Sequence, residues 1–298
     1  MGLDLDTFLT ALYTVVDDVY RERLAGVMAH RPGPAPVLSD SEVLALGICA
    51  EWGHWGSERA FYRFVRRRLR HLFPRLVDYA EFNRRRRGLY PALAAIQRAV
   101  AQRLGADLER ERLLDTVPVP VMVLPRHDAE GSCFDGRAAV AWCQAKRRFY
   151  YGLKLVLALA LDGVIVRYDL VPAGTQDREA AHTVLEPGCR YWADKGFFGQ
   201  GCQREWREAE GADVRATPPR GARARWPRPL AYRAARVRQL IEVVNAQLVG
   251  QFQLTRSLAK TLVGLVTRVQ AKLTAHTFGV YLNVLAGEPP LALKTLVV

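Results

Sequence analysis

The sequence predicts a mixed α/β domain that follows an all-helical N-terminal region. Over about the first hundred residues, apolar side chains recur at the three- and four-residue spacing of amphipathic helices. From about residue 111 the pattern changes to short runs of Val, Leu and Ile separated by turn residues, which is typical of strands. The 298 residues are too many for one minimal domain, so we expect a main domain and a smaller accessory region.

The N-terminal helices are indicated by residue spacing and by a capping motif. The opening segment carries apolar residues at helical spacing, namely Leu5, Phe8, Leu9, Leu12, Val15, Val16 and Val19. The proline-rich stretch 31–37, RPGPAPV, interrupts this helix, and Ser39 with Glu42 three residues later forms a capping box that begins the next one. Further helices are predicted over 57–72 and 79–104.

Five strands with intervening helices are predicted beyond residue 111. The predicted strands are 113–123, 151–161, 164–171, 189–193 and 213–216, and the predicted helices are 177–185, 200–210 and 230–251. Asp162 and Gly163 indicate a tight turn between the second and third strands, because Asp-Gly tolerates positive φ angles. The order is β-β-β-α-β-α-β-α, and the segment 217–229, rich in Arg and Pro, is predicted to be a loop.

The charge balance favours a polyanionic partner. The chain has 43 Lys and Arg against 30 Asp and Glu, which gives a net charge of +13, so nucleic acid is the leading partner class. Thirteen Arg lie between residues 57 and 104. They form either a solvated helix face or a phosphate-binding surface, of which Arg84 and Arg85 are the candidate contacts.

Other function classes are not indicated. The N-terminus lacks the basic start and long apolar run of a signal peptide, and no apolar segment is long enough to span a bilayer, so the sequence predicts a cytoplasmic protein. The five Cys are scattered without a CxxC pair, which argues against a zinc site or a disulfide framework. Neither a Ser-His-Asp pattern nor a phosphate-binding P-loop is present.

Three carboxylates are candidates for chemistry. Asp115 and Asp194 follow short apolar runs, where a strand would deliver a side chain into a crevice, although each could be an ordinary turn or capping residue. Glu242 lies in a predicted helix and shares one face with Arg238 and Asn245, at spacings that also suit a surface ion pair. Together, three carboxylates can hold two hard divalent cations that clamp the attacking and leaving oxygens of a phosphodiester.

Several blocks resemble one known family. The segments LLDTVPVPV, RRFYYGLKLVL, LVPAGTQDRE, ADKGFFGQ and LIEVVNAQL resemble bacterial insertion-sequence transposases with a DDE site, and most of all the insertion sequence 982 family. The likeness extends to LSDSEVLALGI (38–48), FPRLVDYAEFNRRRR (73–87) and the closing NVLAGEPPLALKTL.

The resemblance implies a fold, a site and a reaction. The implied fold is a ribonuclease H-like mixed five-stranded sheet with flanking helices over 108–285, after a helical DNA-binding region over 1–107 and before a tail at 286–298. In this fold the first and fourth strands are neighbours, so Asp115 and Asp194 would lie side by side and the last helix would bring Glu242 to them. These three residues would be the catalytic ligands of two Mg²⁺ ions, for which Mn²⁺ can substitute. The partners would be double-stranded DNA at the element ends and the target, bound by a homodimer.

The chain also departs from the fuller family signature. A Tyr three residues before Arg238 and a Lys seven residues after Glu242 are replaced by Ala235 and Val249. Arg238 and Asn245 would contact the scissile strand or hold the glutamate. Basic residues that could compensate are Lys154, Lys195 and the eight Arg between 215 and 238.

A fourth carboxylate and two alternative functions remain. Asp177 is predicted to cap the helix that follows it and is therefore left out of the metal site. A metal-dependent nuclease that cuts without joining would use the same site. A degenerate or domesticated copy that only binds DNA would fit the changes at Ala235 and Val249.

Overall fold

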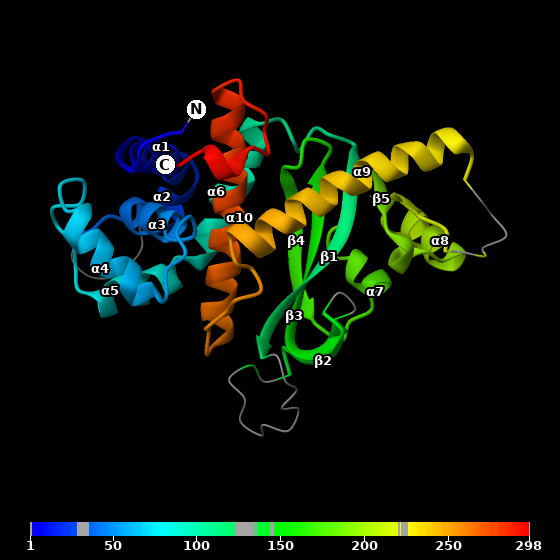
Figure 1. Cartoon of the computed structure of the whole chain (residues 1–298), viewed down its shortest axis with the longest axis horizontal. Helices are drawn as coiled ribbons and strands as arrows, with labels where there is room; N and C mark the ends of the chain where they lie inside the picture. Colours follow the sequence, from blue (N-terminus) through cyan, green and yellow to red (C-terminus); the bar gives the residue numbers. More distant parts are fainter. Residues whose placement is uncertain are drawn as a thin grey trace. The chain divides into compact units, whose positions relative to one another are not determined.

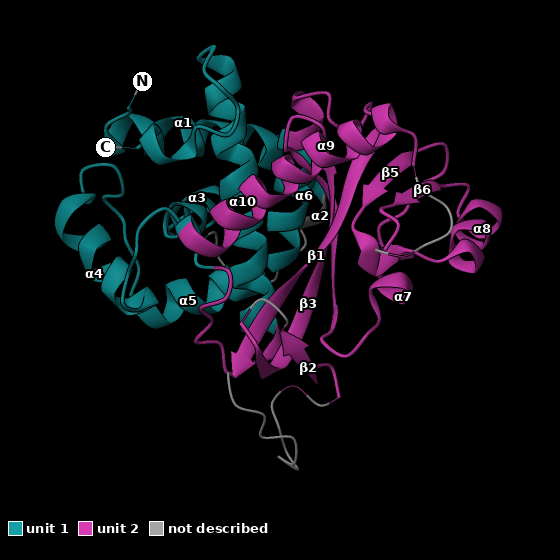
Figure 2. Ribbon diagram, turned by 45° about the vertical axis from the view of Figure 1, so that its right-hand side comes forward, with its two compact units in different colours: residues 1–100, 251–253, 263–298 teal, residues 101–250, 254–262 magenta. Residues whose placement is uncertain are grey.

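The computed structural model describes residues 2–28, 36–122, 134, 136–143, 146–219, 221 and 226–297. The predicted break at 31–37 lies largely outside these ranges, as does part of the loop predicted at 217–229. The described chain forms two compact units, coloured separately in Figure 2. Unit 1 comprises 1–100, 251–253 and 263–298, and unit 2 comprises 101–250 and 254–262.

Unit 1 is helical, as predicted for the N-terminal region. Its helical elements are α1 (Leu5–Val19), η1 (Tyr20–Leu24), α2 (Ala25–Met28), α3 (Asp40–Cys49), α4 (Glu58–Arg68), α5 (Tyr79–Gly88), α6 (Tyr90–Arg103), α10 (Leu262–Leu285) and η4 (Leu293–Thr295). The predicted capping box is confirmed, because Ser39 Oγ accepts from the Glu42 amide and the Glu42 carboxylate accepts from the Ser39 amide. The single helix predicted over 79–104 is wrong: the chain breaks at Leu89, since Pro91 cannot donate a helical hydrogen bond.

The interior of unit 1 includes an ion-pair network. Arg86 is buried and contacts both Glu51 and Glu58, at 2.7 and 2.9 Å. Lys272 pairs with Glu51, and Arg268 pairs with Glu58 at 3.2 Å, so ion pairs join the long helix α10 to the turn after α3 and to the start of α4. The α10 helix therefore groups with the N-terminal helices, whereas the sequence division placed it in the range 108–285.

Unit 2 is a mixed sheet with helices on both faces. Its strands are β1 (Glu111–Met122), β2 (Ala139–Cys143), β3 (Arg148–Ala160), β4 (Ile165–Pro172), β5 (Arg190–Ala193) and β6 (Asp213–Ala216). Its helical elements are α7 (Asp177–Ala181), η2 (Lys195–Phe197), α8 (Gln200–Ala209), α9 (Arg228–Ala246) and η3 (Gln247–Gln251). The sheet order is β2-β3-β1-β5-β6, and β4 pairs with β3.

The strand pairing confirms part of the prediction and corrects part of it. The hairpin between β3 and β4 turns at Asp162 and Gly163, where Gly163 has a φ of 89°. The strands β1 and β5 pair in parallel, so the first strand and the fourth predicted strand are neighbours. The prediction of five strands missed β2, a short segment of small and aromatic residues that forms a strand by pairing with β3.

Alternation along β1 assigns the helices to opposite faces of the sheet. Leu114 belongs to a buried cluster that includes Ala180 of α7 and Trp206 of α8. Asp115, the next residue and therefore on the other face, is bonded to Asn245 of α9. The helices α7 and α8 thus pack on one face, and α9 lies across the other, as Figure 1 shows. Unit 2 has three layers, with the sheet in the middle.

A search of the described residues for long apolar helices found none able to cross a membrane.

Candidate functional site

Asp115 lies where β1 leaves its parallel neighbour. The register pairs Leu114 with Ala193, the last residue of β5, and Asp115 is the next residue of β1. The strand itself continues to Met122 by pairing with β3, so Asp115 lies inside its strand, as the predicted strand over 113–123 implies. After Leu114, β1 no longer pairs with β5 and pairs only with β3. Pro118 and Pro120 fit in this part of the strand because proline lacks the amide that a strand paired on both sides would require.

Asp194 follows β5 directly, as predicted. It adopts an extended conformation before the short turn η2, and its side chain is 37% exposed. Leu114 and Ala193 are register partners at the end of the parallel pairing between β1 and β5. The residues that follow them, Asp115 and Asp194, therefore lie at the same end of this pairing.

The helix α9 supplies the third carboxylate. Ile241 and Val244 of α9 are buried, as is Leu248 of η3, which follows α9 directly, as expected for the apolar stripe of a helix that packs on a sheet. Glu242 lies beside this stripe with its side chain 64% exposed. The same face carries Arg238 and Asn245, one turn before Glu242 and about one turn after it.

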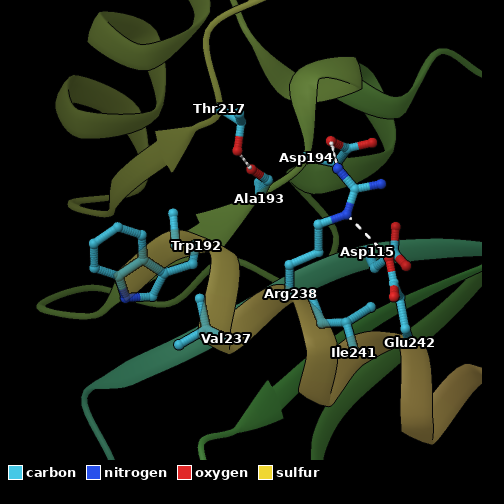
Figure 3. A pocket seen from close by; sticks show the side chains of 10 residues that line it. Asp115, Trp192, Ala193, Asp194, Thr217, Val237, Arg238, Ile241 and Glu242 are labelled. Atoms are coloured by element: carbon cyan, nitrogen blue, oxygen red, sulfur yellow. Dashed lines mark hydrogen bonds and ion pairs between the residues drawn. The ribbon is translucent and has the colours of Figure 1, made fainter. Parts of the chain in front are cut away.

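The three carboxylates line one pocket. The pocket has about 470 Å³ of empty space, part of it open to solvent, and its lining includes Asp115, Asp194, Arg238 and Glu242. Figure 3 shows the Arg238 guanidinium between the carboxylates of Asp194 and Glu242. Arg238 Nη1 is 3.2 Å from Asp194 Oδ1, and Arg238 Nε is 3.1 Å from Glu242 Oε1. The predicted triad and Arg238 are therefore brought together in space.

Burial makes Asp115 an unusual carboxyl group. Its pKa is raised to about 6, first because burial disfavours the charged form and also because Asp194 and Asp177 are negatively charged neighbours. Two hydrogen bonds oppose this shift, one from the Thr116 amide and one from the Asn245 side chain, whose Nδ2 is 2.6 Å from Asp115 Oδ2. The concentration of negative charge favours a cation at this place.

The side chains suit a hard divalent cation once the Arg238 guanidinium moves aside. Among the described residues, no group of three His, Cys, Asp or Glu side chains is arranged as a ready metal site. Every candidate ligand is an oxygen, which Mg²⁺ prefers. Asn245 Oδ1 is buried and receives no hydrogen bond from the part of the chain that the structure describes, so a further oxygen is available beside Asp115. Arg238 already places a positive charge between two carboxylates, and its side chain is 57% exposed and able to move.

The other predicted residues lie outside the pocket. Lys154 lies on the α7 face of the sheet, where its ammonium contacts Asp177 Oδ1 at 2.7 Å and the Thr175 carbonyl oxygen at 2.7 Å. The capping role predicted for Asp177 is wrong, because Gln176 is the cap residue and the Asp177 carboxylate accepts instead from Lys154 and Thr116. Lys195 is exposed in η2, next to Asp194.

Arg84 and Arg85 differ in their surroundings within unit 1. The Arg84 side chain is 73% exposed and pairs with Glu81, one turn earlier on α5. Arg85 is only 8% exposed and pairs with Asp40 at 2.7 Å. Of these two cations, Arg84 is thus the one that a phosphate can reach without breaking a buried ion pair.

Sequence reasoning missed several residues around the pocket. Trp192 lines it, donates to Glu111 and lies under two guanidinium groups, those of Arg215 and Arg233, at 5.8 and 5.9 Å from the ring centre. Thr217 closes another side and is bonded to the Ala193 carbonyl oxygen. The Arg residues after residue 214 predict positive charge in this part of the chain, but the contact of Arg215 and Arg233 with the buried Trp192 depends on the fold.

The fold and the pocket define an α/β protein whose carboxylates gather where the parallel pairing of two central strands ends, beside a basic helix. A scan against family models matched residues 121–278 to the transposase DDE domain, which is more than half of the chain. The chain therefore belongs to the transposase DDE domain family, whose members generally use divalent metal ions. The comparisons with curated proteins and with solved structures found no match.

Proposed function

We propose that the chain is the transposase of a bacterial insertion sequence, similar to the 982 family, which cleaves DNA at the element ends and joins them to target DNA. The proposal rests on one observation above all. Carboxylates from β1, from the end of β5 and from α9 line a single pocket, although they are far apart in the sequence. Family membership supports the same class of reaction. The catalytic unit would be a ribonuclease H-like domain, with which the mixed sheet is compatible.

Asp115, Asp194 and Glu242 would hold two Mg²⁺ ions, or Mn²⁺ in their place, with Asn245 Oδ1 as a further oxygen. Bound metal would lower the pKa of a water molecule and neutralise charge on the phosphate. The raised pKa of Asp115 supports this assignment, because a carboxyl group destabilised by burial and by like charges gains most from a cation.

The remaining side chains would bind and orient. Asn245 holds one oxygen of Asp115 by its 2.6 Å hydrogen bond and so fixes the orientation of this carboxylate. Arg238 would exchange its two carboxylates for a phosphate of the scissile strand, because a guanidinium binds both groups with the same planar geometry. Lys195, exposed beside Asp194, would contact the DNA backbone. We assign no direct DNA contact to Lys154, because Asp177 and Thr175 already hold its ammonium.

The helical N-terminal region over 1–107 would bind the element ends, with Arg84 as one phosphate contact. A pair of chains would hold the two ends together. This division assigns sequence-specific binding to the helices of unit 1 and phosphoryl transfer to unit 2, with 286–298 as a tail.

A joining assay tests the proposal. The purified chain is incubated with Mg²⁺, a linear fragment that carries the gene's own flanking DNA with pre-cut ends, and a circular target plasmid. We expect insertion products in which the 3′ ends of the fragment are joined to the target, and none when Glu242→Gln replaces the native chain. Cutting without joining would favour a nuclease.

A second candidate, a copy that binds DNA without cutting it, is motivated by Ala235 and Val249. Both lie on the exposed or half-buried side of the α9 region, where the fuller signature has a Tyr and a Lys. If the chain binds its flanking DNA but gives neither nicks nor joints with Mg²⁺ or Mn²⁺, this second function replaces the first.

A further inference from the structure

The end of the hairpin formed by β2 and β3 exposes two aromatic rings. Trp142 is 48% exposed and Phe149 is 51% exposed, and both are among the most exposed large apolar residues of the described chain. They are register partners across the two strands, with ring centres 4.9 Å apart in an edge-to-face arrangement. We call these two residues the aromatic pair. Exposed aromatic side chains that are held together in this way are typical of a binding surface.

The opposite face of the same hairpin is buried. Cys143 and Tyr150, the neighbours of the aromatic pair along each strand, pack with Ala173 in a small apolar cluster. This cluster anchors the hairpin to the rest of the sheet, so the aromatic pair is presented on a fixed support. The aromatic pair is therefore exposed although the hairpin that carries it is packed against the rest of the protein.

Three exposed cations adjoin the aromatic pair. Lys146, Arg147 and Arg148 are all exposed and lie between the two strands or at the start of β3. The sequence from 136 to 154 contains no Asp or Glu, so no acid of the hairpin neutralises them. Clustered cations beside aromatic rings suit a nucleic acid, in which phosphates alternate with flat bases.

The aromatic pair and the pocket are connected by one strand, β3, along which bound DNA could extend. Leu157 of β3 is the register partner of Asp115, and Phe149 lies eight positions earlier on the same strand. Because side chains alternate with a period of two, Phe149 is on the same face of the sheet as Asp115. At about 3.3 Å per residue the two positions are about 26 Å apart, and this length corresponds to about eight base pairs at 3.4 Å each.

We propose that the aromatic pair and its three cations bind DNA about eight base pairs from the cleaved phosphate. The cations contact phosphates, and the two rings pack against bases that are locally unpaired or unstacked. This inference rests on the proposed function, since it takes DNA as the substrate of the pocket. It assigns DNA binding to a part of the sheet that lies outside the carboxylate site.

Fluorescence anisotropy with two DNA probes tests the inference. One probe is a labelled duplex of random sequence, and the other is the same duplex with a short unpaired centre, both in EDTA so that no cleavage occurs. We expect Trp142→Ala with Phe149→Ala to weaken binding to the unpaired probe by about tenfold or more, and to weaken binding to the full duplex less. Trp142→Phe should keep the affinity while it removes part of the tryptophan quenching caused by DNA.

The cations have their own measurement. Substitution of Lys146, Arg147 and Arg148 by Gln should reduce the slope of log affinity against log salt by about 2.7, since each phosphate contact contributes about 0.9. Arg148→Ala alone should reduce it by about 0.9. The matched control is Arg204→Ala, which removes an exposed cation from α8 beside β6, at the opposite edge of the sheet from β2. Arg204→Ala should leave the slope unchanged.

The outcomes separate this inference from the proposed function. If the native chain binds neither probe, both fail. If it binds DNA and the hairpin variants bind with native affinity and salt slope, the inference alone is wrong. If the aromatic substitutions change the sedimentation of the chain while DNA binding stays native, the aromatic pair is a contact between two copies and the inference is overturned.

Discussion

Replacing Arg238 by Ala should strengthen metal binding and weaken DNA cleavage at the same time. In the free chain the Arg238 guanidinium is 3.2 Å from Asp194 and 3.1 Å from Glu242, so a divalent cation must displace it from both carboxylates. The side chain is 57% exposed, and an exposed ion pair contributes about 0.2 to 1 kcal/mol. Two such contacts amount to about 1 kcal/mol, which corresponds to about fivefold tighter metal binding in the variant.

The assay is a titration of the DNA-free chain with Mn²⁺, followed by calorimetry or by the paramagnetic signal of the free ion. The same proteins are then compared for the rate of plasmid nicking in saturating Mg²⁺. Arg236→Ala is the matched control, because Arg236 is an exposed cation on the same helix that does not line the pocket. It should change neither the metal affinity nor the nicking rate by more than about twofold, as expected for a surface substitution.

The prediction is informative because the metal affinity should rise while the nicking rate falls. A purely structural Arg238 would leave the metal affinity unchanged or lower it when removed, because the pocket would lose order. If Arg238→Ala binds Mn²⁺ no more tightly than the native chain, the guanidinium does not occupy the cation position, and our account of the pocket is refuted.

Three further predictions concern stability, each measured by urea unfolding. Arg86→Met should destabilise the fold by about 2 kcal/mol, because it removes a buried guanidinium that hydrogen-bonds to both Glu51 and Glu58 and leaves each carboxylate with one cation in place of two. Arg84→Met at an exposed ion pair should cost under about 0.5 kcal/mol, and equal effects would contradict this. Burial lowers the pKa of His276 to about 4, so as the pH falls the unfolded chain takes up a proton at this residue before the folded chain does. Between about pH 7.5 and about pH 5 the free energy of unfolding of the native chain should therefore fall by about 2 kcal/mol more than that of His276→Gln. Equal losses in the two proteins would rule this out. Gly152→Ala should cost about 1 to 3 kcal/mol, because its new Cβ would lie 2.3 Å from a main-chain oxygen of β1, while Gly201→Ala has open space and should be neutral or stabilising.

The sequence predicted the elements that have strong local signals. The apolar stripe of α9 and the capping box at Ser39 are local patterns, and the structure confirms both. The Asp-Gly turn at 162–163 is another, because it depends on two residues alone. These features follow from the chain's neighbouring residues, so they require no knowledge of the fold.

Features that depend on distant parts of the chain were missed or wrong. The strand β2 is too short to be recognised alone and exists because β3 pairs with it. Asp177 was expected to cap a helix, but Lys154 comes from a distant strand and takes its carboxylate. No local pattern in the sequence singles out Trp192, because its two guanidinium neighbours come from β6 and α9.

The three carboxylates of the candidate site were predicted from the sequence, whereas some of the hydrogen bonds that they make in the structure were not. The family resemblance proposed Asp115, Asp194 and Glu242 as metal ligands, and the structure places all three in the lining of one pocket. The ion pair of Arg238 with Glu242 follows from their spacing of four residues on α9, which the sequence shows. The contacts of Arg238 with Asp194 and of Asn245 with Asp115 join distant segments, so they depend on the fold and on side-chain rotamers. The same holds for the buried oxygen of Asn245 beside Asp115.

One measurement tests the central claim most directly, that Asp115, Asp194 and Glu242 form one metal-dependent DNA-cutting site. Supercoiled plasmid is incubated in Mg²⁺ with the native chain, with Asp115→Asn, Asp194→Asn and Glu242→Gln, and with the combined Asp115→Asn and Glu242→Gln variant. We predict that each single substitution lowers the nicking rate by about a thousandfold or more and that the combined variant is no slower, because residues that act as a unit do not add. Native DNA affinity in all four variants would show that the chain is folded. Nicking at the native rate by any single variant would contradict the claim.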